Sequence, residues 1–471
     1  MSPGTRTKVL ACVAVLLVAT LGLGCWVLWG DGGPAGTSAH KGLRQGGIED
    51  VPDDATAEQL FTVDAPDLKE GVLATTYGAW ATATSYVKTG YGSVTAYDST
   101  GGRRLWELGL PGDVCAATQD VTPEGYTAVV VRDHLGKRGW NEGGCDRLVV
   151  FDIDDGSAVW RTALPKSKTR FREPELVIGE GVVAVSWYKG SVVYPVTGGK
   201  ALWSEGAAQC SHEMHLTGGG GLVASGRGCA ENHAGRVLWK VNPRTGAPEW
   251  RYRIPKKYWT WDVLSTDPVT VAVSEGDSGV DHEDTEMTHV LSLDGHGRLR
   301  ATIGLSEDYD LYNWDSRERQ HVVTEDTLYL PLHGVDSGRH FAAITAFDLT
   351  TGEVRRSFSS KGGRRMVPLR MSGDRLLGLQ VGHGGSGTKG KTTARVLGID
   401  PATGHRSLLF AAASSDDDVR DLMSLDGVDM CTAVFEHGRL YFGHEAVTGP
   451  RRILDTPADR YLAVAFGTGT R

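Results

Sequence analysis

This chain contains the spacing of a nucleotide-binding loop, Gly-Ser-Gly-Thr-Lys-Gly-Lys-Thr, from Gly385 to Thr392. Such a loop binds phosphate because its backbone amides and the N-terminus of a following helix converge on the anion. The next segment, Thr393 to Asp400, is instead expected to be a strand, since it leads to a Thr403-Gly404 turn that recurs along the chain. No helix can begin there. We therefore predict a hairpin loop and no nucleotide binding.

Two other segments contain residues that commonly bind metals. The run from Cys210 to His215 has two histidines three residues apart, and on a strand these side chains would point to opposite sides. The run from Asp281 to Glu286 is expected to be a charged loop between strands. Because a divalent metal site needs several convergent ligands, we predict no metal and no other cofactor.

A basic and aromatic stretch, Arg251 to Trp261, has the composition of a binding surface, since Tyr, Trp and Arg dominate binding hot spots. Tyr309, Tyr312 and Trp314 would extend such an aromatic rim. The alternative is that alternate rings fill the space between sheets while the cations face water. We favour this second interpretation.

A sequence repeat indicates which strands and turns would position these residues. A tryptophan follows a glycine by four residues in four successive stretches, at steps of 54, 43 and 47 residues. The pairs are Gly102 and Trp106, Gly156 and Trp160, Gly199 and Trp203, and Gly246 and Trp250. A period of this length is typical of the four-stranded blades of a β-propeller.

Each repeat has the pattern of a strand, a turn and a returning strand. An acidic or amide residue ends the first strand and can bond the backbone two residues on, and a glycine then supplies the positive φ of the turn. The tryptophan lies on the returning strand, where its ring can fill the wedge between neighbouring blades. We assign these structural roles to Asp98, Trp106, Asp152, Trp160, Trp203, Trp250, Asp348 and Asp400.

Counting the weaker copies, in which Ala301, Arg356, Leu408 and Ile453 take the place of the tryptophan, gives eight blades. Seven is the alternative, if the first and last sheets merge. The fold class is thus all-β, a single propeller over residues 59–471.

The motif of a strand ending in Asp, then Thr-Gly, then Trp, resembles the repeat of the pyrroloquinoline-quinone-like (PQQ-like) β-propeller family, from about Phe61 onward. The resemblance implies relatives as different as quinoprotein dehydrogenases, outer-membrane assembly lipoproteins, and propellers of membrane-anchored proteins in Gram-positive bacteria. Dehydrogenases of that kind typically hold the quinone with a disulfide between adjacent cysteines, and no two cysteines are adjacent here. We predict that the chain is not an enzyme.

The N-terminal residues predict a membrane anchor. Residues 1–8 would be a cytoplasmic tail, and Val9 to Trp29 is an uncharged run that, at about 1.5 Å per residue, spans a hydrocarbon core of roughly 30 Å. Arg6 and Lys8 would keep the N-terminus in the cytoplasm and direct the rest outward. Residues 30–58, rich in Gly, Asp, Pro and Ala, would form a flexible linker. A lipoprotein attached at Cys25 and a secreted protein are the alternatives.

The remaining cysteines are consistent with an oxidising compartment. We predict disulfides between Cys115 and Cys145 and between Cys210 and Cys229, which leaves Cys431 as a buried thiol; five reduced thiols are the alternative.

The net charge of −9 argues against nucleic-acid binding, which needs a positive field. The run Asp416-Asp417-Asp418 is expected to be an exposed loop.

The sequence thus predicts a single-pass protein of the plasma membrane with an extracellular propeller. Its expected role is non-catalytic, as a binding or scaffold module for an envelope protein or ligand that the sequence does not identify. A quinone-dependent oxidoreductase or other propeller enzyme is one alternative, and a sensor or structural component of the envelope is another.

Overall fold

The computed structural model describes residues 46–132, 144–165, 174–187, 190–206, 222–227, 236–275, 287–306, 309, 320–336, 339–360, 364–382, 391–423, 431–450 and 458–468. The chain divides into two compact units, Met1–Ala39 and His40–Arg471, and every described residue belongs to the second. Among the described residues, no helix is long and apolar enough to cross a membrane, and the predicted anchor at residues 9–29 lies outside them.

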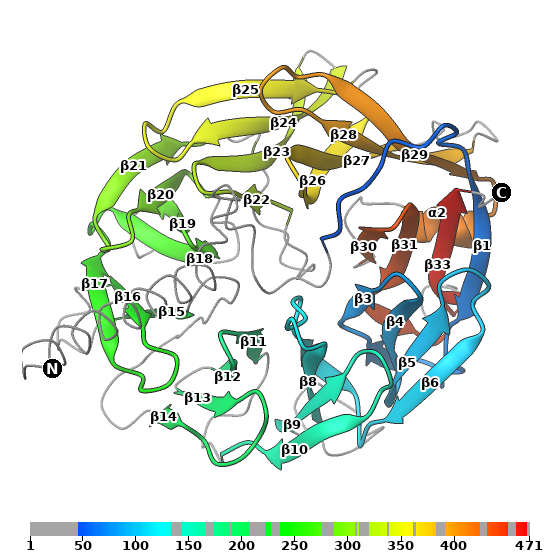
Figure 1. Cartoon of the computed structure of the whole chain (residues 1–471), viewed down its shortest axis with the longest axis horizontal. Coiled ribbons are helices and arrows are strands. Elements are labelled where there is room, and N and C mark those ends of the chain that lie inside the picture. The colour runs from blue at the N-terminus through cyan, green and yellow to red at the C-terminus, as the bar shows by residue number, and fades with distance from the viewer. Residues whose placement is uncertain are drawn as a thin grey trace, which may run out of the picture. The chain divides into compact units, whose positions relative to one another are not determined.

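The second unit is a β-propeller of eight blades, arranged as a ring of antiparallel sheets (Figure 1). Blade 1 contains β3 (Ala79–Ala81), β4 (Ser85–Gly90), β5 (Ser93–Asp98) and β6 (Arg104–Gly109). Blade 2 contains β7 (Val114–Ala117), β8 (Tyr126–Arg132), β9 (Cys145–Asp152) and β10 (Ala158–Ala163). Blade 3 contains β11 (Glu175–Gly179), β12 (Val182–Trp187), β13 (Gly190–Pro195) and β14 (Trp203–Gly206). The described strands of blade 4 are β15 (Leu222–Arg227), β16 (Arg236–Val241) and β17 (Pro248–Arg253).

The second half of the ring continues the same order. Blade 5 contains β18 (Tyr258–Thr266), β19 (Val269–Glu275), β20 (His289–Leu293) and β21 (Leu299–Gly304). Blade 6 contains β22 (Val322–Val323), β23 (Thr327–Asp336), β24 (Arg339–Asp348) and β25 (Val354–Ser359). Blade 7 contains β26 (Arg365–Ser372), β27 (Arg375–Gly382), β28 (Thr392–Ile399) and β29 (Arg406–Ser414).

Blade 8 closes the ring with strands from both ends of the chain. Its sheet order is β30 (Cys431–Glu436), β31 (Arg439–His444), β33 (Tyr461–Thr468) and β1 (Ala57–Asp64). A second closure is the small sheet of β2 (Leu73–Thr75) and β32 (Ala446–Thr448). The first and last repeats therefore remain separate blades, which gives eight rather than the alternative seven.

The strands of a blade are lettered A to D from the centre of the ring outward (Figure 1). Because neighbouring strands are antiparallel, the turns between A and B strands emerge on one face of the propeller, and those between B and C strands on the other. We call these the AB face and the BC face.

The turns form as the sequence predicts. Oδ1 of Asp98 accepts hydrogen bonds from the amides of Thr100 and Gly101, at 3.1 and 2.9 Å. Asp348 and Asp400 accept the equivalent pairs, and Asp152 accepts the amide of Asp154 at 2.8 Å. Such hydrogen bonds to a short polar side chain stabilise the turn locally, so each of these four blades carries its own hairpin signal.

The tryptophans of the repeat lie between blades. The half-buried ring of Trp106 from blade 1 covers Gly156 in the turn of blade 2 so closely that a Cβ atom at Gly156 would overlap it. Trp160, Trp203 and Trp250 cover Gly198, Gly246 and Gly297 of the next blade in the same way. Nε1 of Trp106, Trp160 and Trp203 also donates to a backbone oxygen of that turn, at 2.7 to 3.1 Å. Each ring thereby fixes the spacing of two blades, as predicted.

One expectation about the surface is wrong. The acidic run Asp416-Asp417-Asp418 is not a loop, because helix α2 (Asp417–Met423) begins within it. Oδ1 of Asp416 accepts the amides of Asp418 and Val419 at 3.1 and 3.4 Å, which is the contact of a helix N-cap. Leu422 is fully buried on the inner side of this helix, so apolar packing stabilises a segment whose charge suggested a loop.

The last part of the expected linker is also bound to the propeller. Residues 46–56, which we call the N-terminal arm, run from the middle of the ring across blade 7 to β1 (Figure 1). Within the arm only Glu49 is buried, and β1 begins at Ala57, inside the expected linker.

Candidate functional site

Most of the residues that suggested chemistry in the sequence lie outside the part of the chain that the structure describes. Thr392 is the first residue of strand β28, so a strand follows the P-loop-like stretch, as expected. Residues 383–390, the Cys210 to His215 run and the Asp281 to Glu286 run lie outside the described residues. Within the part of the chain that is described, no group of three or more His, Cys, Asp or Glu side chains could hold a metal ion.

The aromatic stretch of residues 251–261 is divided between two blades. Tyr252 packs against the apolar core between blades 4 and 5, and Tyr258 is buried in that core. Lys257 lies 4.5 Å from the centre of the Tyr258 ring and pairs with Glu275 at 3.3 Å. These rings therefore fill space between blades, which is the interpretation that the sequence favoured. Tyr309 also packs on a core ring, whereas Tyr312 and Trp314 lie outside the described residues.

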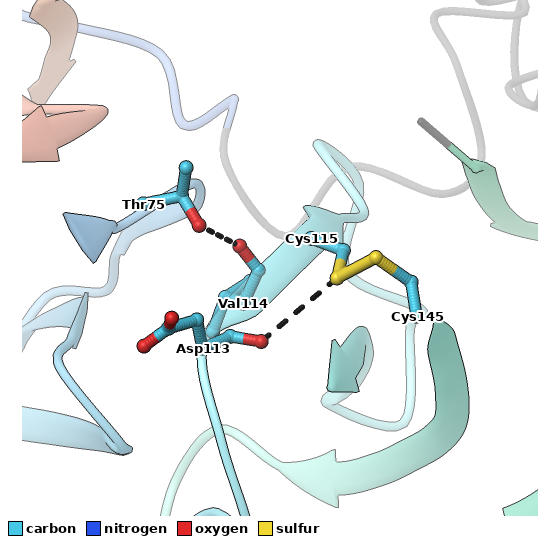
Figure 2. The surroundings of a disulfide bond; sticks show 5 residues. All are labelled: Thr75, Asp113, Val114, Cys115 and Cys145. Carbon is cyan, nitrogen blue, oxygen red and sulfur yellow. Dashed lines mark hydrogen bonds between the residues drawn. A yellow bond between two sulfur atoms is a disulfide. The ribbon is translucent and has the colours of Figure 1, made fainter. Parts of the chain in front are cut away.

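The structure pairs Cys115 with Cys145, as expected from the sequence (Figure 2). The bond joins the A and C strands of blade 2 at the BC face and closes a sequence separation of 30 residues. Next to it, Oγ1 of Thr75 donates to the carbonyl oxygen of Val114 at 2.5 Å, which attaches the small closing sheet to blade 2. Cys431 is a buried thiol whose Sγ lies 3.4 Å from Nδ1 of His444, and Cys210 and Cys229 lie outside the described residues.

Lys88 is buried between blades 8 and 1, with 1% of its surface exposed. Its Nζ donates to the carbonyl oxygens of Thr76 and Gly78 and to Oγ1 of Thr89. Burial lowers the pKa of this amine to about 7, although Glu445 acts in the opposite direction. An amine near neutrality could act as a base, but its hydrogen bonds go to the protein's own oxygens. Lys88 therefore attaches the segment before β3 to blade 1 and stabilises the closure.

A cluster of ion pairs lies on the AB face, where blades 7 and 8 meet the N-terminal arm. Arg370 comes from β26, Glu436 is the last residue of β30, and Glu49 comes from the arm. The guanidinium of Arg370 bonds Oε1 of Glu49 at 2.8 Å and Oε2 of Glu436 at 3.0 Å. The side chains of Glu49 and Glu436 are 6% and 2% exposed, so solvent hardly screens these ion pairs.

The backbone of the β30–β31 turn completes the binding of Glu49. The amide of His437 donates to Oε1 of Glu49 at 2.8 Å, and the amide of Gly438 donates to Oε2 at 3.0 Å. Both residues have positive φ, 51° and 68°, a conformation that lets consecutive amides point at one anion. We call Arg370, Glu436 and the amides of His437 and Gly438 the carboxylate site.

The electrostatics of the carboxylate site favour one negative charge. Burial raises the pKa of Glu436 to about 7, while Arg370 acts to lower it and Glu49 to raise it further. Near neutral pH, Glu436 is therefore partly protonated, and the positive charge of Arg370 is available to the carboxylate of Glu49. The arrangement recognises a carboxylate by a guanidinium and two backbone amides. It is the candidate functional site of the described residues.

Sequence reasoning did not identify this site. Glu49 and Arg370 are separated by 321 residues, and Glu49 falls in a segment whose composition predicts a linker. The His437-Gly438 pair does suggest a turn with positive φ. A buried carboxylate beside that turn has no local signal in the sequence.

Comparisons with known proteins agree with the fold. The profile of the family described as outer membrane protein assembly factor BamB matches residues 50–295 and 146–407. No curated protein matches the sequence at a significant level.

Three solved structures illustrate the breadth of similar folds. BamB from Moraxella catarrhalis is 13% identical, with 88% of this chain and 100% of that chain covered and a TM-score of 0.45. Quinohemoprotein alcohol dehydrogenase from Comamonas testosteroni is 13% identical, with coverages of 91% and 77% and a TM-score of 0.42. The WD40 domain of SCAP from fission yeast is 9% identical, with coverages of 88% and 98% and a TM-score of 0.47. Likeness at this level does not bear on function.

Proposed function

The chain belongs to the family of the outer membrane protein assembly factor BamB, and from this premise we propose that it is a non-catalytic binding or scaffold module for a protein of the cell envelope. Residues 9–29 would anchor it in the plasma membrane, with the propeller outside the cell. The observation that carries the proposal is the match of the family profile, whose two overlapping segments together cover residues 50–407 of the propeller.

Two features of the structure support the proposal. The hydrogen bonds of the buried Lys88 and the half-buried Arg370 go to other groups of the chain, and that of Arg370 to Glu436 joins blade 7 to the closing blade 8. A closed ring of this kind is a rigid platform for binding. The Cys115–Cys145 disulfide supports an oxidising compartment and hence an extracellular propeller.

The binding role is tested by cross-linking in the cells that make the protein. The tagged full chain is cross-linked in its own membranes and purified, with an unrelated single-pass membrane protein of equal abundance as the control. We expect one envelope protein to be recovered reproducibly with this chain and not with the control. Recovery of the same proteins with both chains would refute a specific binding role.

The location is tested separately with protease added to intact cells. If residues 30–45 connect an anchor to an external propeller, protease should release a compact fragment that contains the Cys115–Cys145 disulfide. A chain that stays intact until the cells are lysed would contradict the proposed location.

The enzyme alternative is tested by thermal unfolding. A bound quinone and Ca²⁺ would raise the melting temperature by mass action, by an amount that grows with ligand concentration. We expect an unchanged melting temperature when both are added to the purified full chain. A concentration-dependent increase would favour the quinoprotein alternative over a purely binding role.

A further inference from the structure

The N-terminal arm is bound to the propeller by polar contacts rather than by apolar packing. Glu49 is its only buried residue, whereas the apolar side chains of Ile48 and Val51 are 73% and 52% exposed. Besides the carboxylate, the arm is held through its backbone. The amide of Glu49 donates to Oγ of Ser372 at 2.7 Å, and Arg375 donates to the carbonyl oxygen of Glu49.

These contacts involve only a glutamate carboxylate and backbone groups, which any extended peptide with a glutamate would offer. Arg370 binds the Gly47 carbonyl oxygen at 3.0 Å as well as the Glu49 carboxylate. The other hydrogen-bond partners of Glu49 named above belong to blade 7 or to the β30–β31 turn. The propeller thus contains a complete peptide-carboxylate site, and the arm is its ligand within the same chain.

We propose that the carboxylate site is a binding site for an acidic, extended segment of a partner protein, and that the N-terminal arm occupies it as an exchangeable internal ligand. The arm blocks the site until a partner segment replaces Glu49 with a carboxylate of its own. The exposed Ile48 and Val51 make exchange feasible, because releasing the arm uncovers little apolar surface. The proposal deepens the proposed function, since it identifies the surface and the chemistry by which a partner would bind.

The charge of the site suits an acidic ligand. Without Glu49, the site retains the guanidinium of Arg370, two amides of the turn and the buried carboxyl of Glu436. Arg375, the first residue of β27 in blade 7, adds a second cation, which donates to the carbonyl oxygen of Glu49. An incoming carboxylate therefore meets two guanidinium groups and at most one negative charge, so the site is positive in either protonation state of Glu436.

The test uses a labelled peptide with the sequence of residues 46–54, acetylated and amidated, and the full chain purified in detergent. In the wild-type chain the tethered arm competes at an effective concentration on the order of millimolar. Glu49→Lys removes the competitor, because a lysine would face Arg370. Asp50→Lys is the matched control, with the same change of charge at an exposed neighbouring residue.

We expect fluorescence anisotropy to show binding to the Glu49→Lys chain that is at least about tenfold tighter than to the wild-type or Asp50→Lys chain. Replacing the glutamate of the peptide by glutamine should weaken binding about tenfold or more, since hydrogen bonds to a charged group are lost. Adding Arg370→Met to Glu49→Lys should have a similar effect. If that double variant does not fold, Arg370→Lys keeps a charge while losing the paired geometry, and should still weaken binding.

Equal binding of the peptide to the wild-type, Glu49→Lys and Asp50→Lys chains would overturn the proposal. Equal binding of the glutamate and glutamine peptides would also overturn it. A wild-type dimer that Glu49→Lys dissociates would also overturn it, in favour of arm exchange between copies. Because the probe is synthetic, failure here leaves the cross-linking test of the binding role unaffected. A failed cross-linking test likewise leaves the peptide result to be judged separately.

Discussion

Replacing Gly156 by alanine tests directly whether the tryptophan wedge holds neighbouring blades together. Gly156 has φ of 73°, where an alanine costs about 1 to 2 kcal/mol. The new methyl group would also overlap the ring of Trp106, and such overpacking costs about 1 to 3 kcal/mol. We expect the free energy of unfolding to fall by about 2 to 5 kcal/mol in total.

The matched control is Gly71→Ala. Gly71 has nearly the same φ, 69°, but nothing lies within 4 Å of the position of its Cβ atom. It should lose only the backbone term, about 1 to 2 kcal/mol. The measurement is the urea midpoint of unfolding at an unchanged slope m.

A double-mutant cycle isolates the contact itself. In a Trp106→Ala background the ring is absent, so Gly156→Ala should cost no more than Gly71→Ala does in the wild-type chain. The reasoning is refuted if Gly156→Ala costs the same in both backgrounds, or if it costs no more than Gly71→Ala in the wild-type chain.

Three further predictions concern the closing blade and the disulfide. Glu436 faces Arg370 and Glu49, and its raised pKa contributes stability that is present below pH 4.5 and lost as pH rises through about 7. Glu436→Gln should therefore flatten the stability profile between these two pH values, by about 3 kcal/mol, in urea titrations. The lowered pKa of Lys88 has the opposite sign, so stability should increase as pH rises from about 7 toward 10.5, and Lys88→Met should remove that increase. An unchanged pH profile in either variant would contradict the assignment. Cys115→Ser with Cys145→Ser should lower the free energy of unfolding by about 3 to 4 kcal/mol, and reduction of the wild-type chain should lower it by at least as much; a smaller loss than 1 kcal/mol would contradict a stabilising bond.

The fold could be predicted from the sequence because its signals are local. Asp98 and the glycine four residues on lie in one turn, and the turns at Asp348 and Asp400 repeat the same hydrogen bonds without help from the rest of the ring. The wedge role of Trp106 follows from the same repeat, since any blade has a next blade beside it. The Cys115–Cys145 pairing could also be predicted, because both cysteines belong to one blade.

The carboxylate site could not be predicted because it depends on closure of the ring. Glu49 reaches Arg370 only after β1 has joined blade 8, which brings the N-terminal arm over a turn formed near the other end of the chain. The burial of Lys88 could not be predicted for a similar reason, since it depends on contact between blades 8 and 1. The helix at Asp417 was missed because its stability comes from apolar residues on its buried side, whereas its first residues suggest a solvated loop.

The most direct measurement for the binding role is position-specific photo-crosslinking in cells. A photoreactive residue replaces either Asp374, an exposed residue in the β26–β27 turn beside the carboxylate site, or Val354, which is 56% exposed on the outer strand of blade 6. We predict a single discrete adduct with an envelope protein from position 374 and none from position 354. Absence of an adduct at 374, or the same adducts from both positions, would contradict the account.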